Sequence, residues 1–380
     1  MDNYKSGDFI TQHKGTGSEY KSFSPTFINK NFILKNQKIV VELEKATRLL
    51  GELNAYGNII PNVDFFIHMH VTAEAVSSSK IEGTRTNVDD ALLPEEEIAL
   101  ELRNDWREVN NYTKALNDAV KNISELPVAS RMIREIHKTL LQSARGKNKI
   151  PGEFRSSQNW IGGSSVNNAH FVPPCHDEIG SLLSDWEHFW HNEKIEIPIL
   201  VKIAILHYQF ETIHPFLDGN GRVGRLLIPL QLIEKGYLTK PVLYISKYFE
   251  QNRQRYYNAL DEVRFNDSLE EWVLFFLEGV SQTSQRSKQI FESIIDLKAQ
   301  TDQLAISSSR RATKYGLLFD YLYRYPIVSV NDVAFRLKTG YDTANSLVTE
   351  LVDKKILLEI TGQSRNRLFI FEDYVKIFRG

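Results

Sequence analysis

Residues 214–225 have the sequence HPFLDGNGRVGR, and no other segment of the chain is as informative. The segment places His214, Asp218, a glycine-rich turn and two arginines within twelve residues. Histidine can accept a proton at neutral pH, and a carboxylate suits a hard metal ion. A glycine-rich helix start and guanidinium groups both suit phosphate oxygens. The segment therefore predicts a site for chemistry on a phosphate.

Gly219, Asn220 and Gly221 precede a helix that we expect to start near Arg222. The first amides of a helix lack internal acceptors and carry the positive end of its dipole. Glycines let such amides converge on an anion and let a phosphate approach closely. Arg222 and Arg225 are three residues apart, so they share one helix face. Two cations at a helix N-terminus oppose the dipole by about 0.3–1 kcal/mol each, a cost that a bound polyphosphate would offset.

Each part of the segment has an ordinary structural alternative. His-Pro alone is typical of a turn and Gly-Asn-Gly alone of a helix cap, but their combination with Asp218 and both arginines favours a functional site. Gly219, Gly221 and Gly224 also fit a dinucleotide-binding fingerprint. That fingerprint needs a strand directly before the glycines and an acid about 20 residues later. Residues 211–218 intervene here and residues 237–246 contain no acid, which argues against it.

Composition bounds the class of protein. The chain has 380 residues, 42% of them hydrophobic and 25% charged, which is typical of a globular protein with two or three domains. A net charge of −2 gives no general reason to expect nucleic acid or membrane as the main partner. Cys175 is the only cysteine, which excludes an internal disulfide and a cysteine-based zinc site. The polar start has no apolar signal-peptide core, so we expect a cytoplasmic protein.

Apolar periodicity predicts a mainly α fold: a helical core with a short β-hairpin, an N-terminal helical region and a C-terminal winged helix domain. Residues 1 to about 35 are expected to form an extended polar arm. A helix covers 39–50, and another starts after Pro61 and continues to Glu82, before Gly83. Further helices are expected at 101–121, 129–142, 177–190, 199–213, 222–235, 249–263 and 269–298.

Two regions depart from the helical pattern. Residues 155–174 contain two short runs around a Gly/Ser/Asn turn, which predicts a β-hairpin, with an irregular loop as the alternative. Residues 305–310 are small and polar, which predicts a linker. Helices at 315–323, 330–338 and 341–354 and strands at 357–360 and 368–371 then follow the order of a winged helix-turn-helix module. We expect domains at 1–110, 111–300 and 301–380.

Residues 214–225 match the Fic motif, His-x-Phe-x-(Asp/Glu)-Gly-Asn-Gly-Arg-x-x-Arg, at every position. The chain thus resembles the Fic family over roughly residues 30–300, with an appended module as in multidomain bacterial Fic proteins. The resemblance implies a helical protein adenylyltransferase that uses ATP and Mg²⁺. Such an enzyme transfers AMP to a Tyr, Thr or Ser hydroxyl of a target protein. Family variants that move phosphate or phosphocholine usually depart from this consensus, which favours AMP.

The resemblance also implies roles for individual residues. His214 would deprotonate the target hydroxyl, and Asp218 would hold Mg²⁺. Gly219, Asn220 and Gly221 would bind phosphate through an anion hole and Arg222 and Arg225 would hold the distal phosphates, with Val223 and Gly224 in the same phosphate-binding segment. Trp160, Ile161 and Gly162 resemble a flap that aligns the target by strand addition. Tyr256 and Tyr257 resemble aromatic residues near the adenine, and packing in the core is the alternative for both.

Residues 78–83, SSKIEG, match the family's inhibitory pattern, with Ser78, Glu82 and Gly83 at its defining positions. Gly83 is expected to end a helix, which places Glu82 at the negative end of the dipole, where an acid is unfavourable unless a cation meets it. The resemblance implies Arg225 as that cation, so the γ-phosphate would lose its arginine. A solvated surface glutamate is the alternative. In some family members this glutamate is thought to position a water that removes AMP, so AMP removal is a second implied activity.

The C-terminal module leaves the choice of partner open. From residue 301 onward Lys and Arg slightly outnumber Asp and Glu, and Arg365 and Arg367 lie at the expected wing. The expected recognition helix, 342–354, has few basic residues. DNA binding, homodimerisation and target docking all stay open, as does self-modification, whereas no membrane partner is expected. The alternative function is a DNA-binding transcriptional regulator with a nucleotide-sensing core, but a pure sensor would not need His214.

Overall fold

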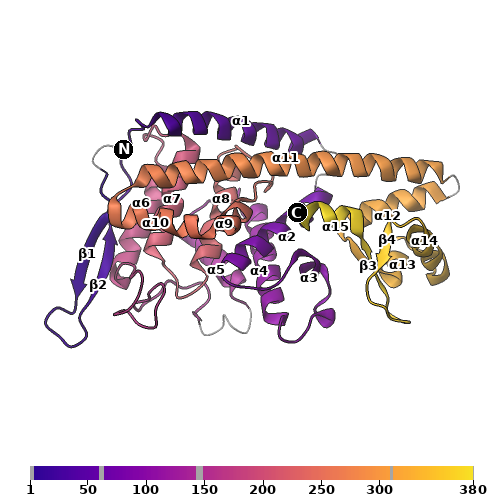
Figure 1. The fold of residues 1–380 in the computed structure, drawn as a ribbon, viewed down its shortest axis with the longest axis horizontal. Coiled ribbons are helices and arrows are strands. Elements are labelled where there is room, and N and C mark those ends of the chain that lie inside the picture. Colours follow the sequence, from indigo (N-terminus) through magenta and orange to yellow (C-terminus); the bar gives the residue numbers. More distant parts are fainter. Residues whose placement is uncertain (1–3, 60–63, 143–148, 309–310, 380) are drawn as a thin grey trace.

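The computed structural model describes residues 4–59, 64–142, 149–308 and 311–379, and it is mainly helical, as predicted (Figure 1). Its helices are α1 (Gln37–Ile59), α2 (Asp64–Ile81), α3 (Val88–Leu92), α4 (Arg103–Asn122), α5 (Ser130–Leu140), α6 (Ile179–His191), α7 (Ile199–Ile213), α8 (Asn220–Glu234), α9 (Ile245–Gln251), α10 (Arg253–Asn266), α11 (Leu269–Ser307), α12 (Ala312–Arg324), α13 (Val330–Arg336), α14 (Tyr341–Asp353) and α15 (Glu372–Arg379). Its strands are β1 (Gly7–Gln12), β2 (Tyr20–Pro25), β3 (Ile327–Ser329), β4 (Leu357–Glu359) and β5 (Leu368–Phe371).

Helix α7 lies at the centre of the core. Every residue from Leu200 to Ile213 is buried, including polar side chains such as Gln209 and Glu211. Two tryptophans from neighbouring helices donate their indole N–H to its carbonyls: Trp186 to Leu206 at 2.9 Å and Trp272 to Ala204 at 2.7 Å. The helix that begins the motif is therefore fixed from several sides, and the motif follows directly from its end.

The two longest helices, α1 and α11, lie side by side along one edge of the molecule (Figure 1). The predicted linker at 305–310 is wrong for its first three residues, because α11 continues to Ser307. Ala305 is buried, and the Thr301 hydroxyl lies 3.0 Å from that of Tyr323 on α12, so packing favours the helix there. Residues 309–310 of that linker lie outside the described residues.

Other parts of the sequence prediction need correction. The N-terminal arm is not a single extended segment, because β1 and β2 pair as an antiparallel hairpin. The helix expected at 249–263 is two helices, α9 and α10, separated at Asn252, whose side chain bonds back to the Tyr248 carbonyl at 2.9 Å. Between 155 and 174 the two runs form a single antiparallel bridge, Ile161 with Phe171, and no strand. Pro61, the expected start of the second helix, lies outside the described residues.

The C-terminal region has the predicted order of helices and strands together with two elements that the prediction lacked, β3 and α15. The sheet is antiparallel with order β3-β5-β4. Helix α15 returns to α2, where the Phe378 ring lies 5.0 Å from that of His70. The predicted boundaries at 110/111 and 300/301 fall inside α4 and α11, so the division into domains stays a prediction. No described helix has both the length and the apolarity needed to cross a bilayer.

Candidate functional site

The motif begins where α7 ends, at His214, which adopts a left-handed conformation (φ 50°, ψ 58°). Arg155, only 3% exposed, holds this turn: its guanidinium donates to the carbonyls of His214 (3.0 Å), Pro174 (2.6 Å), Ser157 (3.1 Å) and Ile213 (3.4 Å). Its backbone amide donates to the Pro215 carbonyl at 2.9 Å. Burial lowers the pKa of Arg155 to about 10, which still leaves the side chain charged at pH 7. The acceptors of its guanidinium named above are all neutral carbonyl oxygens.

His137 supports the next part of the loop. Its ring stacks on Phe216 with centroids 3.7 Å apart and an interplanar angle of 11°. Nδ1 accepts from the Gly152 amide at 2.8 Å, so Nε2 carries the proton and donates to the Asp218 carbonyl at 3.1 Å. Burial lowers the pKa of His137 to about 4, which keeps the ring neutral at pH 7. The ring therefore has a positioning role.

The Asn220 side chain also closes the loop, since its oxygen accepts from the Phe216 amide at 2.8 Å and its nitrogen donates to the Phe216 carbonyl at 2.9 Å. Only the backbone of Asn220 is therefore free to meet a ligand. Gly219 caps α8 with φ 80°, and the first amides of α8 have no acceptor within the helix. Val223 is fully buried, and a Cβ on Gly224 would overlap the Glu211 carboxylate, so these two residues face the core.

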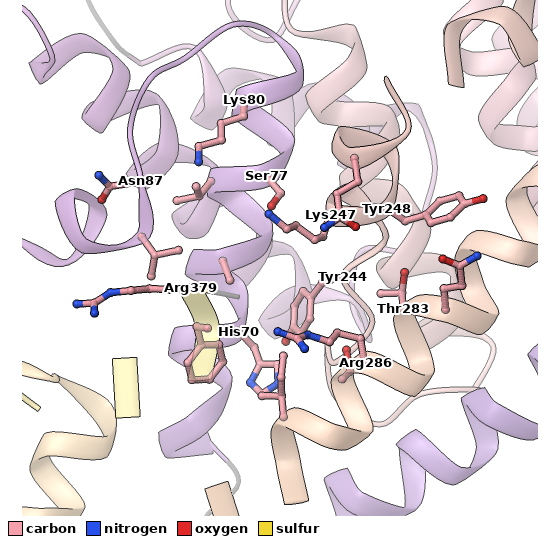
Figure 2. A pocket seen from close by; sticks show the side chains of 18 of the residues that line it. His70, Ser77, Lys80, Asn87, Tyr244, Lys247, Tyr248, Thr283, Arg286 and Arg379 are labelled. Carbon is pink, nitrogen blue, oxygen red and sulfur yellow. The ribbon is translucent and has the colours of Figure 1, made fainter. Parts of the chain in front are cut away.

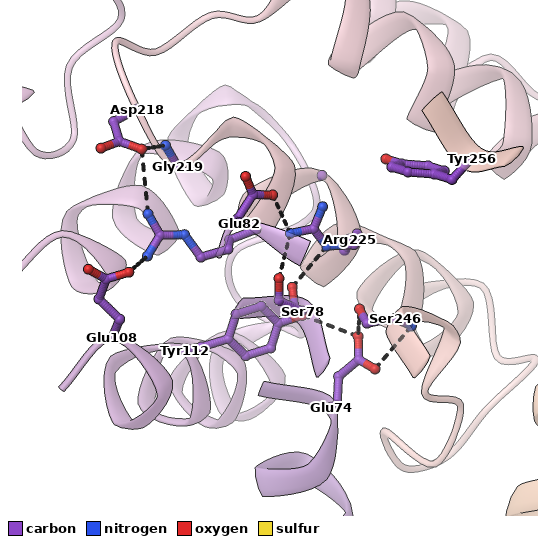
Figure 3. A network of polar contacts seen from close by, with 12 residues as sticks. Glu74, Ser78, Glu82, Glu108, Tyr112, Asp218, Gly219, Arg225, Ser246 and Tyr256 are labelled. Atoms are coloured by element: carbon purple, nitrogen blue, oxygen red, sulfur yellow. Dashed lines mark hydrogen bonds and ion pairs between the residues drawn. The ribbon is translucent and has the colours of Figure 1, made fainter. Parts of the chain in front are cut away.

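Both arginines of the motif are buried and paired with carboxylates from other helices (Figure 3). Arg222 donates to Glu108 of α4 at 2.8 Å and lies 3.5 Å from Asp218. Arg225 donates to Glu82 at 2.6 Å, to the Ser78 hydroxyl at 2.9 Å and to the Ser78 carbonyl at 2.9 Å. The structure thus brings Ser78 and Glu82 of residues 78–83 to Arg225, the arginine that the resemblance implied.

The Glu82 carboxylate lies over the start of α8. A Cβ added to Gly221 would overlap Glu82 Oε1. Burial opposes ionisation of this carboxyl, but the attraction of Arg225 outweighs it and holds the pKa of Glu82 below its ordinary value. Gly83 follows with φ 99°, a conformation that favours glycine and ends the helix. The charged carboxylate therefore lies where an anion bound to the first amides of α8 would lie.

His214 and Asp218 lie at the rim of this position. Burial, followed by the nearby Arg264, lowers the pKa of His214 to about 4, so its ring is neutral at pH 7. Its Nδ1 lies 3.4 Å from the Glu211 carbonyl, which leaves Nε2 as the proton acceptor. The Asp218 side chain is 48% exposed. The described residues contain no group of three or more His, Cys, Asp or Glu able to hold a metal. A single accessible carboxylate suits Mg²⁺ that is also bound by substrate phosphates.

The two tyrosines predicted near adenine differ. Tyr256 is buried, stacks on Phe249 with centroids 4.6 Å apart and bonds to His207 at 2.9 Å, so it packs in the core. Tyr257 is 37% exposed. Burial raises the pKa of Tyr257, and the charge of Glu82 adds to the rise.

The candidate flap, residues 160–162, is held by backbone bonds between Ile161 and Phe171 at 2.8 and 3.1 Å. The Phe171 ring packs under the guanidinium of buried Arg264, with 4.1 Å between them, and Arg264 also donates to the Glu211 carbonyl at 3.2 Å. Trp160 is 42% exposed and Gly162 has φ 67°. An exposed ring beside a paired backbone is consistent with contact to a target.

Sequence reasoning missed Arg155, His137 and Glu108. Arg155 and His137 act on backbone carbonyls and an aromatic ring, which leave no spacing signal. The sequence does offer one indication for Glu108: within the helix predicted at 101–121, Asp105, Glu108 and Tyr112 lie on one buried face. A buried carboxylate needs a partner, and the arginines were available.

The motif, residues 214–225, lies inside a segment that matches a known family. The description "Fic/DOC family N-terminal" matches residues 40–121 and "Fic/DOC family" matches residues 127–232. The chain is 32% identical over 163 residues to the "Protein adenylyltransferase Fic" of Drosophila grimshawi, covering 42% of this chain and 30% of that one. It is 29% identical over 218 residues to a "Probable protein adenylyltransferase" of Aquifex aeolicus (strain VF5), covering 57% and 60%. The chain therefore spans under two thirds of these relatives.

Among solved structures, a Fic family protein from Desulfovibrio desulfuricans G20 has a TM-score of 0.56 with 19% sequence identity, covering 90% of this chain and 98% of that one. At this identity the likeness concerns the fold alone.

Proposed function

Because the chain belongs to the Fic/DOC family, we propose that it is a protein adenylyltransferase, which transfers AMP from ATP to a hydroxyl side chain of a target protein. One observation carries the proposal: a neutral histidine, His214, lies beside the free amides and two arginines at the start of α8. The names of the matched relatives support it.

In the proposed reaction His214 Nε2 accepts the proton of the target Tyr, Thr or Ser hydroxyl. The hydroxyl oxygen then attacks the α-phosphorus of ATP, and pyrophosphate leaves from the opposite side. The amides of residues 219–221 bind phosphate oxygens, with Arg222 and Arg225 on the distal phosphates. Asp218 would hold Mg²⁺, and the bound ion would neutralise phosphate charge. Residues 160–162 align the target backbone.

We also propose that Glu82 inhibits this reaction within the same chain. Its carboxylate pairs with Arg225 at 2.6 Å and lies against Gly221. The γ-phosphate of ATP would then find neither a free Arg225 nor room above Gly221. Removal of AMP by a water that Glu82 positions is a further proposal, and it requires the same carboxylate at the same place.

The test is incubation of the full chain with α-labelled ATP and Mg²⁺, followed by detection of label on protein, including on the enzyme itself. Glu82→Gly should raise transfer more than tenfold, because Arg225 becomes free. Glu101→Gly, which removes an exposed acid elsewhere, is the matched control and should leave transfer unchanged. No increase for Glu82→Gly would refute the inhibition.

Adding His214→Ala to the Glu82→Gly chain should abolish transfer while ATP still binds. Persistent transfer would assign the base to another group, and the proposed chemistry would be wrong. The acidic character of α14 argues against the alternative of a DNA-binding regulator, since this helix carries Asp342, Glu350 and Asp353 and no basic residue within its bounds. Retention on duplex DNA that weakens steeply with salt would revive it.

A further inference from the structure

A second cavity lies away from the motif, among α2, α9, α11 and α15 (Figure 2). Its volume is about 550 Å³, within the range of small-molecule sites. No residue of the segment 214–225 lines it. Helix α2 contributes one face to this cavity, including Ala73, Ser77 and Lys80. Its neighbouring face carries Ser78, and Glu82 follows directly after the end of the helix.

The lining is strongly positive. Four cations and one carboxylate, Asp89, line it; Arg379 is paired both with Asp89, at 2.6 Å, and with Glu372. Lys247 has an ion pair with Glu250 at 3.3 Å. Within the described ranges, neither Lys80 nor Arg286 has an ion pair. Figure 2 shows Lys80, Lys247 and Arg286 projecting from α2, α9 and α11 around the same space. Such a site attracts an anion.

One wall of the cavity is aromatic. His70 is 1% exposed, and its Nδ1 lies 3.1 Å from the Phe66 carbonyl, to which it donates. Its Nε2 is then an acceptor that is closed off from the cavity and has no partner among the described residues, so the ring contributes by packing alone. The rings of Tyr244 and Phe378 each lie 5.0 Å from the His70 ring. This wall therefore offers a flat ring an aromatic surface to pack on.

We propose that this cavity binds a phosphate-bearing ligand of nucleotide size, with its phosphate on Lys80 and Arg286 and a flat ring on the aromatic wall. The charge requires an anion, guanidinium and ammonium groups suit phosphate, and the aromatic wall suits a flat ring. The volume exceeds what phosphate alone would fill. This site is separate from the amides at the start of α8, so it does not depend on the proposed transfer reaction.

The test is calorimetric titration of the full chain with AMP, GMP, CMP, UMP and inorganic phosphate, in the absence of ATP. At least one mononucleotide should bind, and inorganic phosphate should bind more weakly. The double variant Lys80→Gln/Arg286→Gln should bind the same mononucleotide at least tenfold more weakly. Lys114→Gln/Arg131→Gln removes two exposed cations outside the cavity and should bind it as the wild type does.

A variant that fills the space, Ala73→Leu, should weaken the same mononucleotide without any change of charge, and thermal unfolding of each variant shows that it is folded. Absence of binding by all four mononucleotides would overturn the proposal. Equal affinity in the cavity variants would also overturn it, since the ligand would then lie elsewhere. Because no arm measures transfer, this result is independent of the adenylyltransferase proposal.

Discussion

Arg222 and Arg225 lie one turn apart on α8, yet the regions that hold them differ. Glu108, the partner of Arg222, comes from the middle of α4, and its side chain is 12% exposed. Glu82, the partner of Arg225, comes one residue after the last turn of α2, and its side chain is 35% exposed. Residues beyond a helix end open at lower free energy than residues inside a packed helix. We therefore expect the same kind of ion pair to be permanent at Arg222 and releasable at Arg225.

The largest expected effect tests the permanent side. Glu108→Gln should lower the free energy of unfolding by about 3 kcal/mol, because the buried Arg222 loses its closest charged partner. Glu82→Gln should cost much less, because water reaches that carboxylate. Chemical denaturation of both variants measures the difference. Equal losses would mean that the two pairs are held alike, and the comparison would fail.

The pH dependence of stability tests the loop beside Arg222. The pKa of His137 is about 4 in the folded chain and about 6.5 when unfolded, so below pH 6.5 the unfolded state binds more protons and stability falls. The loss between pH 6.5 and 5 is about 2 kcal/mol, and His137→Phe should lack this part of it. Glu74 and Glu211, whose pKa values burial raises to about 7, act in the opposite direction in both proteins and cancel in the difference. Denaturation at several pH values provides the measurement; parallel curves would contradict the neutral assignment of His137.

A smaller effect is expected at the releasable side. Ser78→Ala removes one of three bonds to Arg225, the 2.9 Å bond to the Ser78 hydroxyl, and keeps those to the Ser78 carbonyl and Glu82. A net hydrogen bond of about 0.5–1 kcal/mol corresponds to a roughly two- to fivefold rise in transfer. Ser79→Ala is the matched control, since Ser79 Oγ has no hydrogen-bond partner in the described part of the chain. A rise of the same size in both variants would contradict a specific role for Ser78.

The smallest expected effect is a nearly flat pH profile. Transfer by the Glu82→Gly chain should change less than twofold between pH 6 and 8, because His214, with a pKa of about 4, is neutral throughout. Loss of Glu82 removes an acid that raises this pKa, so the profile should stay flat. Initial rates across that range measure it. A steep fall below pH 7 would mean that the ring is more exposed during the reaction than in the inhibited chain.

The parts of the fold predicted well are those with a strong local pattern. The bounds of α7 match the prediction because a long apolar run is followed directly by His-Pro. Strands β1 and β2 were missed because the N-terminal residues are mostly polar, and β3 and α15 were missed because each is short and depends on contacts with other segments. The Phe378 ring, for example, meets His70, which lies more than 300 residues earlier.

The candidate site divides in the same way. The motif residues are contiguous in the sequence, so their proximity was predictable, and the Glu82–Arg225 contact was expected from the resemblance. Arg155 and His137 act on backbone carbonyls, and any sequence supplies those. The burial of Tyr256 depends on Phe249 and His207 from two other helices, which is why the sequence left core packing and adenine contact open.

The absence of a side chain at Gly221 has one more consequence. The space above its Cα admits the Glu82 carboxylate now, and in the proposed reaction it admits a phosphate, but it cannot hold both. Glu82 is thus a competitor tethered to its own target, with an effective concentration that dilution of the protein does not change. We expect inhibition of this kind to weaken at higher nucleotide concentration or when the end of α2 moves. Separating one protein molecule from another should leave the inhibition unchanged.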